Sequence, residues 1–383
     1  MFNTSYIEIS KKAFKNNIRY LKKIIGNDIR FSSVIKGNAY GHGVENIVPL
    51  AEEAGIDHFS VFSAKEAYDA LPVMSPKSRI MIMGMLDDEE IEWAIENDIA
   101  FFVFDMGRLE KAVETARMLQ KKACIHIEVE TGFNRTGFDY KEMPALIDYL
   151  KKEKEHYLFE GLCTHYAGAE SLSNYLRIKN QITLFKRFHR YFSRHGLNPQ
   201  LRHTACSAAA LTYPNTIMDM VRFGIAQYGF WPSPETHMFR FQKDSSDANP
   251  LRRLLSWKSK VMVVKEVEAG NFIGYGSSYL ANKRMKIAII PVGYANGFSR
   301  ALSNTGRVLI RGRRVPVIGT VTMNTLTVNV TDIPGVERGD EVVMIGKQKR
   351  LSISIASFCE MSEQLNYQLL TRLPAGIPRF IVT

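Results

Sequence analysis

The chain has 383 residues, a formal net charge of +11 and 45% hydrophobic residues, which allows two or three domains with ordinary globular cores. No apolar run approaches the roughly 18 residues that span a bilayer, and residues 1–22 lack the apolar core of a signal peptide, so we expect a cytoplasmic protein with no membrane partner. Residues 239–383 hold 21 Lys and Arg against 10 Asp and Glu, a difference of +11, but these cations are scattered without interleaved aromatic residues, and we expect no nucleic-acid partner.

Residues 1–238 alternate short β-rich runs with stretches of helical periodicity. The expected strands are Arg30–Ile35, His58–Phe62, Arg79–Met83, Ala100–Phe104, Cys124–Val129, Phe159–Thr164, Leu201–Ala205 and Met220–Phe223. The expected helices include Glu89–Glu96, Met106–Lys121, Met143–Glu155 and Asn174–His195. Eight apolar strands that alternate with helices predict an α/β fold, a parallel (β/α)8 TIM barrel. The competing doubly wound sheet would favour a Gly-rich dinucleotide turn after the first strand, and the sequence has none.

Residues 239–383 have a different pattern, in which β-rich runs are separated by turns. These runs are Lys260–Val267, Met285–Pro291, Arg307–Ile310, Val315–Val321, Leu326–Val330 and Glu341–Ile345, and one helix is expected at Ser354–Leu365. This pattern predicts a mainly antiparallel β domain after the barrel. The four cysteines show neither C-x-x-C spacing nor a histidine at zinc spacing, so we expect free thiols and no metal site.

Polar residues follow several of the expected barrel strands, where the chemistry of such barrels is located. Lys36 and Tyr40 follow the first strand, and the others are Glu128, Arg135, His165, Tyr166, Ser207, Arg222 and Gly224. Each has an ordinary structural explanation when taken alone. A lysine desolvated at such a mouth would have a lowered pKa, and the neutral amine can form a Schiff base or accept a proton. Their convergence on one barrel mouth favours a catalytic site.

The run Val34 to Gly43, VIKGNAYGHG, resembles the pyridoxal-phosphate lysine signature of the alanine racemase family, although Gly37 stands where the family usually has alanine. Further similar segments follow in order: ETGFNRTGF at 130–138, THYAGAE at 164–170, VRFGIAQYG at 221–229, GYGSSY at 274–279, GYANGFSR at 293–300 and, more weakly, GTVTMN at 319–324. The resemblance therefore extends over most of the chain. It implies a barrel of residues 1–238 that binds the cofactor and a β domain of residues 239–383.

The resemblance also implies roles for individual residues. Lys36 would hold pyridoxal 5′-phosphate covalently and act as one proton acid/base, and Tyr275, contributed across a homodimer interface, would be the second base on the opposite face. Two bases on opposite faces suit racemisation, because the α-proton leaves one face and returns to the other. The implied cofactor contacts are Tyr40, Arg135, His165, Ser207, Arg222, Gly224 and Ile225, and the implied substrate contacts are Arg135 and Met323. Arg222 would face the pyridine nitrogen. Because an arginine does not give up its proton, this nitrogen would stay unprotonated.

Several positions depart from the family pattern. Glu128 stands where many members have a carbamylated lysine beside the arginine that matches Arg135, so a carboxylate is present without carbon dioxide. Asn296 and Asn324 replace usual aspartates, Cys206 a usual asparagine and Phe223 a usual proline. Ala375 aligns with a tyrosine that contacts phosphate, which would widen the pocket. These departures leave two substrate hypotheses open, alanine and an alternative of serine or a broader range of amino acids.

Three other hypotheses remain. A related pyridoxal-phosphate decarboxylase would carry a Cys-Asp-Ser type segment near its C-terminus, but Cys359 is followed by Glu360, Met361 and Ser362. A non-catalytic cofactor carrier could consist of a barrel alone, whereas this chain has a second domain with Tyr275 and Met323. A basic nucleic-acid-binding module would show a salt-dependent mobility shift. We favour the amino-acid racemase.

Overall fold

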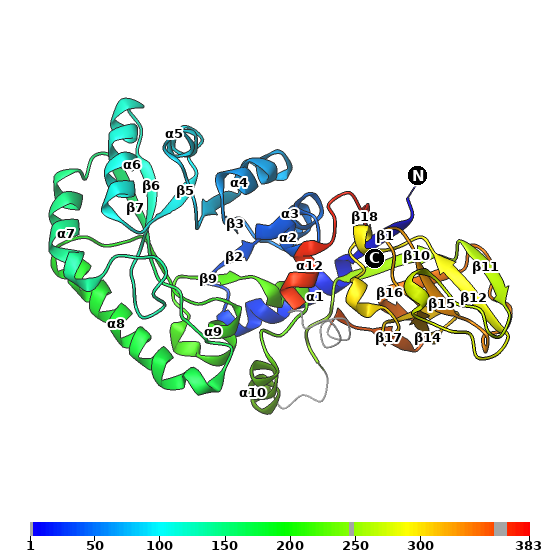
Figure 1. Cartoon of the computed structure of the whole chain (residues 1–383). Helices are drawn as coiled ribbons and strands as arrows, with labels where there is room; N and C mark the ends of the chain where they lie inside the picture. Colours follow the sequence, from blue (N-terminus) through cyan, green and yellow to red (C-terminus); the bar gives the residue numbers. More distant parts are fainter. Residues whose placement is uncertain (1–2, 245–248, 356–365) are drawn as a thin grey trace. The chain divides into compact units, whose positions relative to one another are not determined.

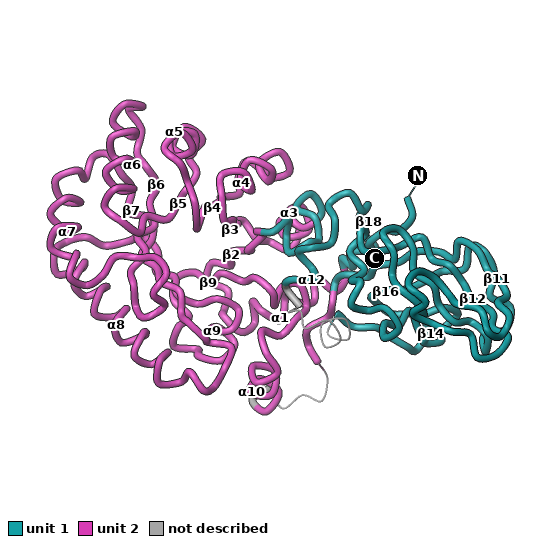
Figure 2. Tube along the Cα trace, viewed as in Figure 1, with its two compact units in different colours: residues 1–11, 37–46, 254–383 teal, residues 12–36, 47–253 magenta. Residues whose placement is uncertain are grey.

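The computed structural model describes residues 3–244, 249–355 and 366–383, and they form two compact units. One unit comprises residues 12–36 and 47–253, and the other comprises residues 1–11, 37–46 and 254–383 (Figure 2). The sequence prediction divides the chain once, between residues 238 and 239, whereas each of these units consists of several chain segments. No described helix combines the length and the apolar character needed to cross a bilayer.

The first unit, which we call the barrel unit, contains eight parallel strands with helices around them (Figure 1). The strands are β2 (Arg30–Val34), β3 (His58–Val61), β4 (Arg79–Ile82), β5 (Ala100–Val103), β6 (Ala123–Glu128), β7 (Tyr157–Cys163), β8 (Leu201–His203) and β9 (Met220–Phe223). Hydrogen bonds from the Asp219 amide to the Arg202 carbonyl (3.1 Å) and from the Arg222 amide to the Ala205 carbonyl (3.0 Å) join β8 to β9. The predicted (β/α)8 barrel is confirmed, and each predicted strand is present within two residues of its expected ends.

Most of the longer helices of the barrel unit bury an apolar face. They are α1 (Lys11–Ile25), α3 (Val44–Glu53), α4 (Ala64–Ala70), α5 (Asp88–Glu96), α6 (Met106–Met118), α7 (Met143–Lys152), α8 (Tyr175–Arg194), α9 (Ser207–Thr212) and α10 (Pro234–Asp244). In α8, for example, Phe185, Phe188 and Phe192 are buried at helical spacing. Asp105 caps α6 by accepting a hydrogen bond from the Arg108 amide, which is the usual role of an N-cap carboxylate.

The second unit, which we call the β unit, is built on a mainly antiparallel sheet with the order β11-β12-β15-β14-β13-β16-β10-β1-β18, and β17 pairs with β16. The strands are β1 (Ser5–Ser10), β10 (Leu255–Lys260), β11 (Val263–Val267), β12 (Met285–Ile290), β13 (Arg307–Ile310), β14 (Arg313–Ile318), β15 (Leu326–Asn329), β16 (Glu341–Gln348), β17 (Leu351–Ile353) and β18 (Arg379–Val382). The predicted antiparallel domain is confirmed. The expected helix at Ser354–Leu365 lies almost entirely outside the described residues, and α12 (Asn366–Arg372) follows it.

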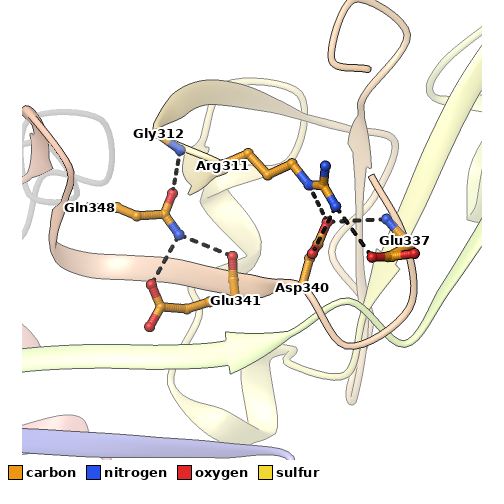
Figure 3. A network of polar contacts seen from close by, with 6 residues as sticks. All are labelled: Arg311, Gly312, Glu337, Asp340, Glu341 and Gln348. Carbon is orange, nitrogen blue, oxygen red and sulfur yellow. Dashed lines mark hydrogen bonds and ion pairs between the residues drawn. The ribbon is translucent and has the colours of Figure 1, made fainter. Parts of the chain in front are cut away.

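Polar contacts hold two hairpin turns of the β unit together (Figure 3). The Arg311 guanidinium donates to Asp340 (2.7 Å) and to Glu337 (3.4 Å). The Gln348 side chain accepts from the Gly312 amide (2.7 Å) and donates to the Glu341 carboxylate (3.0 Å). Part of the positive charge of the C-terminal segment therefore stabilises its own turns.

Candidate active site

The candidate residues of the barrel unit lie where its parallel strands end. Lys36 follows β2 after one residue, Glu128 ends β6, and His165 follows β7. Ser207 begins α9 after β8, and Arg222 lies in β9. Because all eight strands run in the same direction, these positions share one mouth of the barrel.

Lys36 is accessible to solvent at this mouth, yet its pKa is lowered. The main cause is desolvation by the surrounding protein, and the positive charges of Arg135 and Arg222 add to it. Among the described residues no carboxylate forms an ion pair with Lys36. A larger fraction of this amine is therefore neutral, as a nucleophile or a proton acceptor requires.

The chain makes a left-handed turn immediately after Lys36. Gly37, Asn38, Ala39 and Tyr40 have φ values of 63°, 52°, 52° and 53°. For residues other than glycine this conformation costs about 1–2 kcal/mol each, so other contacts must maintain it. They include the Asn38 side chain, which accepts from the Val44 amide (2.9 Å).

His42 is a second support of this turn. Its Nδ1 lies 3.0 Å from the Ala39 carbonyl and 2.9 Å from the Tyr40 carbonyl. Carbonyl oxygens only accept, so Nδ1 carries the proton and donates. Complete burial lowers the pKa of His42 to about 4, which keeps the ring neutral. Sequence reasoning quoted His42 only as part of a motif and gave it no role.

A carboxylate fixes the loop that carries Arg135. Glu130 accepts backbone hydrogen bonds from Gly132, from Phe133 (2.7 Å) and from Asn134 (2.8 Å). The Arg135 guanidinium then lies 4.3 Å from the centre of the Phe133 ring.

The same Phe133 ring contacts His165, with ring centres 5.5 Å apart. Desolvation lowers the pKa of His165 to about 3, and the positive charges of Arg222, Arg135 and Lys36 contribute. A neutral imidazole at this position adds no further cation to the mouth. Phe133 thus joins the two predicted residues Arg135 and His165, and sequence reasoning missed it.

Glu128 is buried at the end of β6, where it accepts a hydrogen bond from the Thr136 hydroxyl (2.7 Å). Burial raises the pKa of this carboxyl, while Thr136, Arg222 and Arg135 oppose the rise. Glu128 therefore places a carboxyl group near the guanidiniums of Arg135 and Arg222. From the sequence we expect Glu128 to take the place of a carbamylated lysine here.

Arg222 is held by neutral acceptors instead of a carboxylate. Its guanidinium donates to the ring Nδ1 of His203, to the His203 carbonyl (2.9 Å) and to the Thr164 carbonyl (2.8 Å). The arginine is only 4% exposed, so its direction is fixed and its charge is not cancelled by an ion pair within the described residues. His203 and Thr164 were not predicted as site residues.

Ser207 and the backbone after β9 form a small cluster of hydrogen-bonding groups. The Ser207 hydroxyl accepts from the amides of Gly224 (3.1 Å) and Ala226 (3.5 Å). Next to this cluster, Gln227 donates to the Val34 carbonyl (3.0 Å) and ties the end of β2 to the segment that contains Ile225. The hydroxyl hydrogen of Ser207 is not used in these two bonds and can donate to a phosphate group placed beside this backbone segment.

The remaining predicted residues, Tyr40, Tyr275 and Met323, belong to the β unit. Tyr275 lies between Gly274 and Gly276, and its side chain is 74% exposed. Met323 is 55% exposed. Ala375 is also exposed, in a turn where its carbonyl accepts from Arg379 (3.0 Å). The β unit therefore presents an aromatic hydroxyl and a thioether on its surface.

Comparisons with known proteins cover nearly the whole chain. Residues 9–232 match the family described as alanine racemase, N-terminal domain, and residues 254–381 match the alanine racemase C-terminal domain. An alanine racemase of Leptospira interrogans is 33% identical over 99% of this chain and 96% of its own length. An alanine racemase of Methanococcus maripaludis is 35% identical over 98% of this chain and 97% of its own length.

Solved structures agree with these matches. The alanine racemase from D-cycloserine-producing Streptomyces lavendulae has a TM-score of 0.90 at 28% identity, covering 100% of this chain and 98% of its own. The alanine racemase from Bartonella henselae, described with covalently bound pyridoxal phosphate, has a TM-score of 0.85 at 25% identity and covers 100% of both chains.

Proposed function

The chain belongs to the alanine racemase family, and on that premise we propose that it interconverts L- and D-alanine with pyridoxal 5′-phosphate as its cofactor. The observation that carries the proposal is the mouth of the barrel unit, where Lys36, with its lowered pKa, lies near Arg135 and Arg222. Such a site combines an amine of lowered pKa with two permanent cations.

The residues at the mouth fit an anionic aldehyde such as pyridoxal phosphate. The positive charges of Arg135 and Arg222 have no ion-pair partner among the described residues, and the Ser207 hydroxyl lies beside the backbone amides of residues 224–226. Lys36 would hold the aldehyde carbon, Ser207 and these amides the phosphate, and Arg222 the ring nitrogen. When bound, this cofactor supplies an electron sink that acidifies the α-hydrogen of an amino acid.

The chain's own residues would then move one proton between two faces. The Lys36 amine takes or returns the α-proton on its side, because its lowered pKa leaves part of it neutral. Arg222 cannot deliver a proton to the ring nitrogen, since its guanidinium does not titrate in proteins. The charges of Glu128 and Arg135 would orient the bound substrate.

We propose Tyr275 as the acid/base on the second face, supplied by a partner subunit of a homodimer. Its 74% exposure supports this assignment, because a catalytic hydroxyl in open solvent needs another surface to exclude water. The exposed side chain of Met323 (55%) belongs to the same unit and would join the substrate site with it.

Alanine is the substrate that the named relatives favour, and the alternative of serine or a broader range is not favoured. The replacement of a tyrosine by Ala375 still predicts a wider pocket. The ratio of kcat/KM for L-alanine to that for L-serine measures this width, and an alanine preference of about 100-fold or more, worth about 2.7 kcal/mol, would contradict a widened pocket.

The proposed function is tested by incubating the purified protein with pyridoxal phosphate and L-alanine in heavy water. We expect D-alanine to form and deuterium to enter the α-position, with loss of both in Lys36→Ala. Borohydride treatment of the loaded protein should fix the cofactor on a peptide that contains Lys36. A cofactor-loaded protein that exchanges no α-proton of alanine would contradict the proposal.

A further inference from the structure

The interior of the barrel unit contains a line of buried polar side chains behind Arg222. Arg222 is 4% exposed, His203 and His126 are fully buried, and Glu160 is 9% exposed. The ring of Phe102 lies 5.8 Å from the His203 ring and 6.2 Å from the His126 ring, so the surroundings are partly apolar. Barrel interiors are usually filled with branched apolar side chains, and buried polar groups there require partners.

The hydrogen bonds along this line have one possible direction. An arginine can only donate, so Nδ1 of His203, which receives a hydrogen bond from the Arg222 guanidinium, carries no proton. The proton of the neutral His203 ring is therefore on Nε2. This Nε2 lies 2.8 Å from Nδ1 of His126, which must then be the acceptor. The proton of His126 is consequently on its own Nε2.

The line ends at a carboxylate. Nε2 of His126 lies 3.8 Å from the nearer oxygen of Glu160, and it has no hydrogen-bond partner within the described residues. A carboxylate at this distance favours a proton on Nε2 of His126 over an unprotonated Nε2. Arg30 and Arg79 lower the pKa of Glu160, although burial outweighs them and raises it overall.

Two backbone features place these groups. The pairing of β6 with β7 shifts between Ile125 and His126, so that Ile125 pairs with Phe159 and His126 pairs with Gly161, and Glu160 is the extra residue. Such a bulge redirects a side chain. A Cβ atom at Gly161 would lie 1.9 Å from Nδ1 of His126, so a larger residue would push the ring away from His203.

We propose that His126 and Glu160 are positioning residues that fix the tautomer of His203 and thereby hold the Arg222 guanidinium in place. The bulge at Glu160 and the space at Gly161 serve this arrangement. If His126 is displaced, His203 is free to place its proton on Nδ1, where it would oppose the N–H groups of Arg222. This inference rests on the proposed role of Arg222 at the cofactor ring, but the tautomers exist with or without the cofactor.

Two-bond ¹H–¹⁵N correlation spectra of protein with ¹⁵N-labelled histidine test the tautomers directly, in the cofactor-free and loaded protein. The chain has nine histidines, which single His→Gln variants at surface positions help to assign. We expect His203 and His126 to be neutral with the proton on Nε2 at neutral pH, in agreement with pKa values lowered by burial. A proton on Nδ1 of either ring, or on both nitrogens, would overturn the proposal.

The variant Gly161→Ala tests the positioning role without changing a polar group. We expect an altered His203 spectrum and about tenfold weaker pyridoxal phosphate binding, since a hydrogen bond to a charged group is worth about a factor of ten or more. Gly107→Ala in α6 is the matched control, because its new Cβ would lie 3.4 Å from the Asp105 carboxylate, an ordinary contact.

A second pair of variants remains informative if Gly161→Ala does not fold. His126→Leu removes the acceptor for His203, whereas the amide oxygen of His126→Asn replaces it. Compared with His126→Leu, we expect His126→Asn to restore the Nε2-protonated form of His203 and most of the cofactor affinity. Glu160→Gln should slightly lower the population of this tautomer and the cofactor affinity. Unchanged His203 spectra and cofactor affinity in His126→Leu would show that the line does not position Arg222. A wild-type protein with the expected tautomers but without racemase activity would instead count against the proposed function alone.

Discussion

The two units of the chain treat their functional side chains in opposite ways. In the barrel unit, Arg222 is 4% exposed and is held by carbonyls and an imidazole. In the β unit, Tyr275 is 74% exposed and lies in a short turn between two glycines. The barrel site is therefore preorganised by its own packing, whereas the Tyr275 side chain is mostly open to solvent and its environment would have to come from the proposed partner subunit.

This difference has an electrostatic consequence. Burial lowers the pKa values of His58, His126, His165 and His203 in the barrel unit and raises the pKa of Glu128. The β unit contains a single histidine, His42. The barrel unit thus keeps several groups neutral at a free-energy cost that depends on pH, and the β unit bears much less of this cost.

The largest effect is expected for Lys36→Ala, which removes the central group of the candidate site at the barrel mouth. Racemisation should fall by at least about 10⁴-fold, because both the covalent attachment point and one proton acid/base are lost. Chiral chromatography of the reaction products measures this loss. Lys154→Ala, an exposed lysine in the same unit, is the control and should retain full activity.

Tyr275→Phe tests the exposed half of the comparison and should cost about 10²–10⁴-fold in racemisation. Cofactor attachment at Lys36 should persist, and α-proton exchange should be impaired on one face only. Exchange rates for L- and D-alanine in heavy water measure the asymmetry. Equal residual exchange from both enantiomers would contradict the division of labour between Lys36 and Tyr275.

If Tyr275 comes from a partner subunit, the specific activity of the wild-type protein should also fall on dilution. We expect this fall to follow the loss of dimer in sedimentation velocity. A monomer of undiminished activity would place both bases in one chain and remove the partner from the proposal.

Acidification should weaken the barrel unit more than the β unit. Each buried histidine has a folded-state pKa below the ordinary value of about 6.5, so the unfolded chain binds protons more readily. The stability that comes from keeping these rings neutral is fully present above about pH 7. It is lost as the pH falls towards the folded-state pKa values, which are about 3 for His58 and His165. The neutral rings of His58 and His165 should each cost about 2 kcal/mol at pH 5.

Tryptophan fluorescence can follow the two units separately. Trp93 lies in α5 of the barrel unit, and Trp257 is fully buried in β10 of the β unit. In variants in which Trp231 and one of these two residues are replaced, so that a single tryptophan remains, urea unfolding at pH 7.5 and pH 5 should show the larger loss of stability at Trp93. Equal losses at both probes would mean that the two units unfold as one.

The sequence predicted the fold well because its main signals are periodic. Alternating apolar strands and helices determined the barrel, and all eight strands were found. The strands that sequence reasoning missed, such as β1 (Ser5–Ser10) and β18 (Arg379–Val382), pair with each other across the whole length of the chain. No local pattern indicates which distant segment completes a sheet.

For the same reason, part of the candidate site could be located from the sequence. Lys36, Arg222 and Ser207 stand at strand ends, which the pattern reveals. His203 and Phe133 support predicted residues through contacts that depend on side-chain direction, which no sequence pattern specifies. A glycine opposite His126 is the signal that could have revealed the internal line, but the bulge that aligns Gly161 with His126 is visible only in the structure.

The smallest expected effect concerns the left-handed turn that follows Lys36 and belongs to the β unit. In His42→Leu the carbonyls of Ala39 and Tyr40 lose their shared donor, and we expect unfolding at Trp257 to become easier by about 1–3 kcal/mol. His42→Asn, whose amide can still donate, should lose less. Because Leu does not titrate, His42→Leu should also remove the fall in stability that we expect for the wild-type β unit between about pH 6.5 and the folded-state pKa of His42, about 4. If the acid sensitivity at Trp257 persists in His42→Leu, the neutral ring of His42 is not its source, and the contrast between the two units must have another cause.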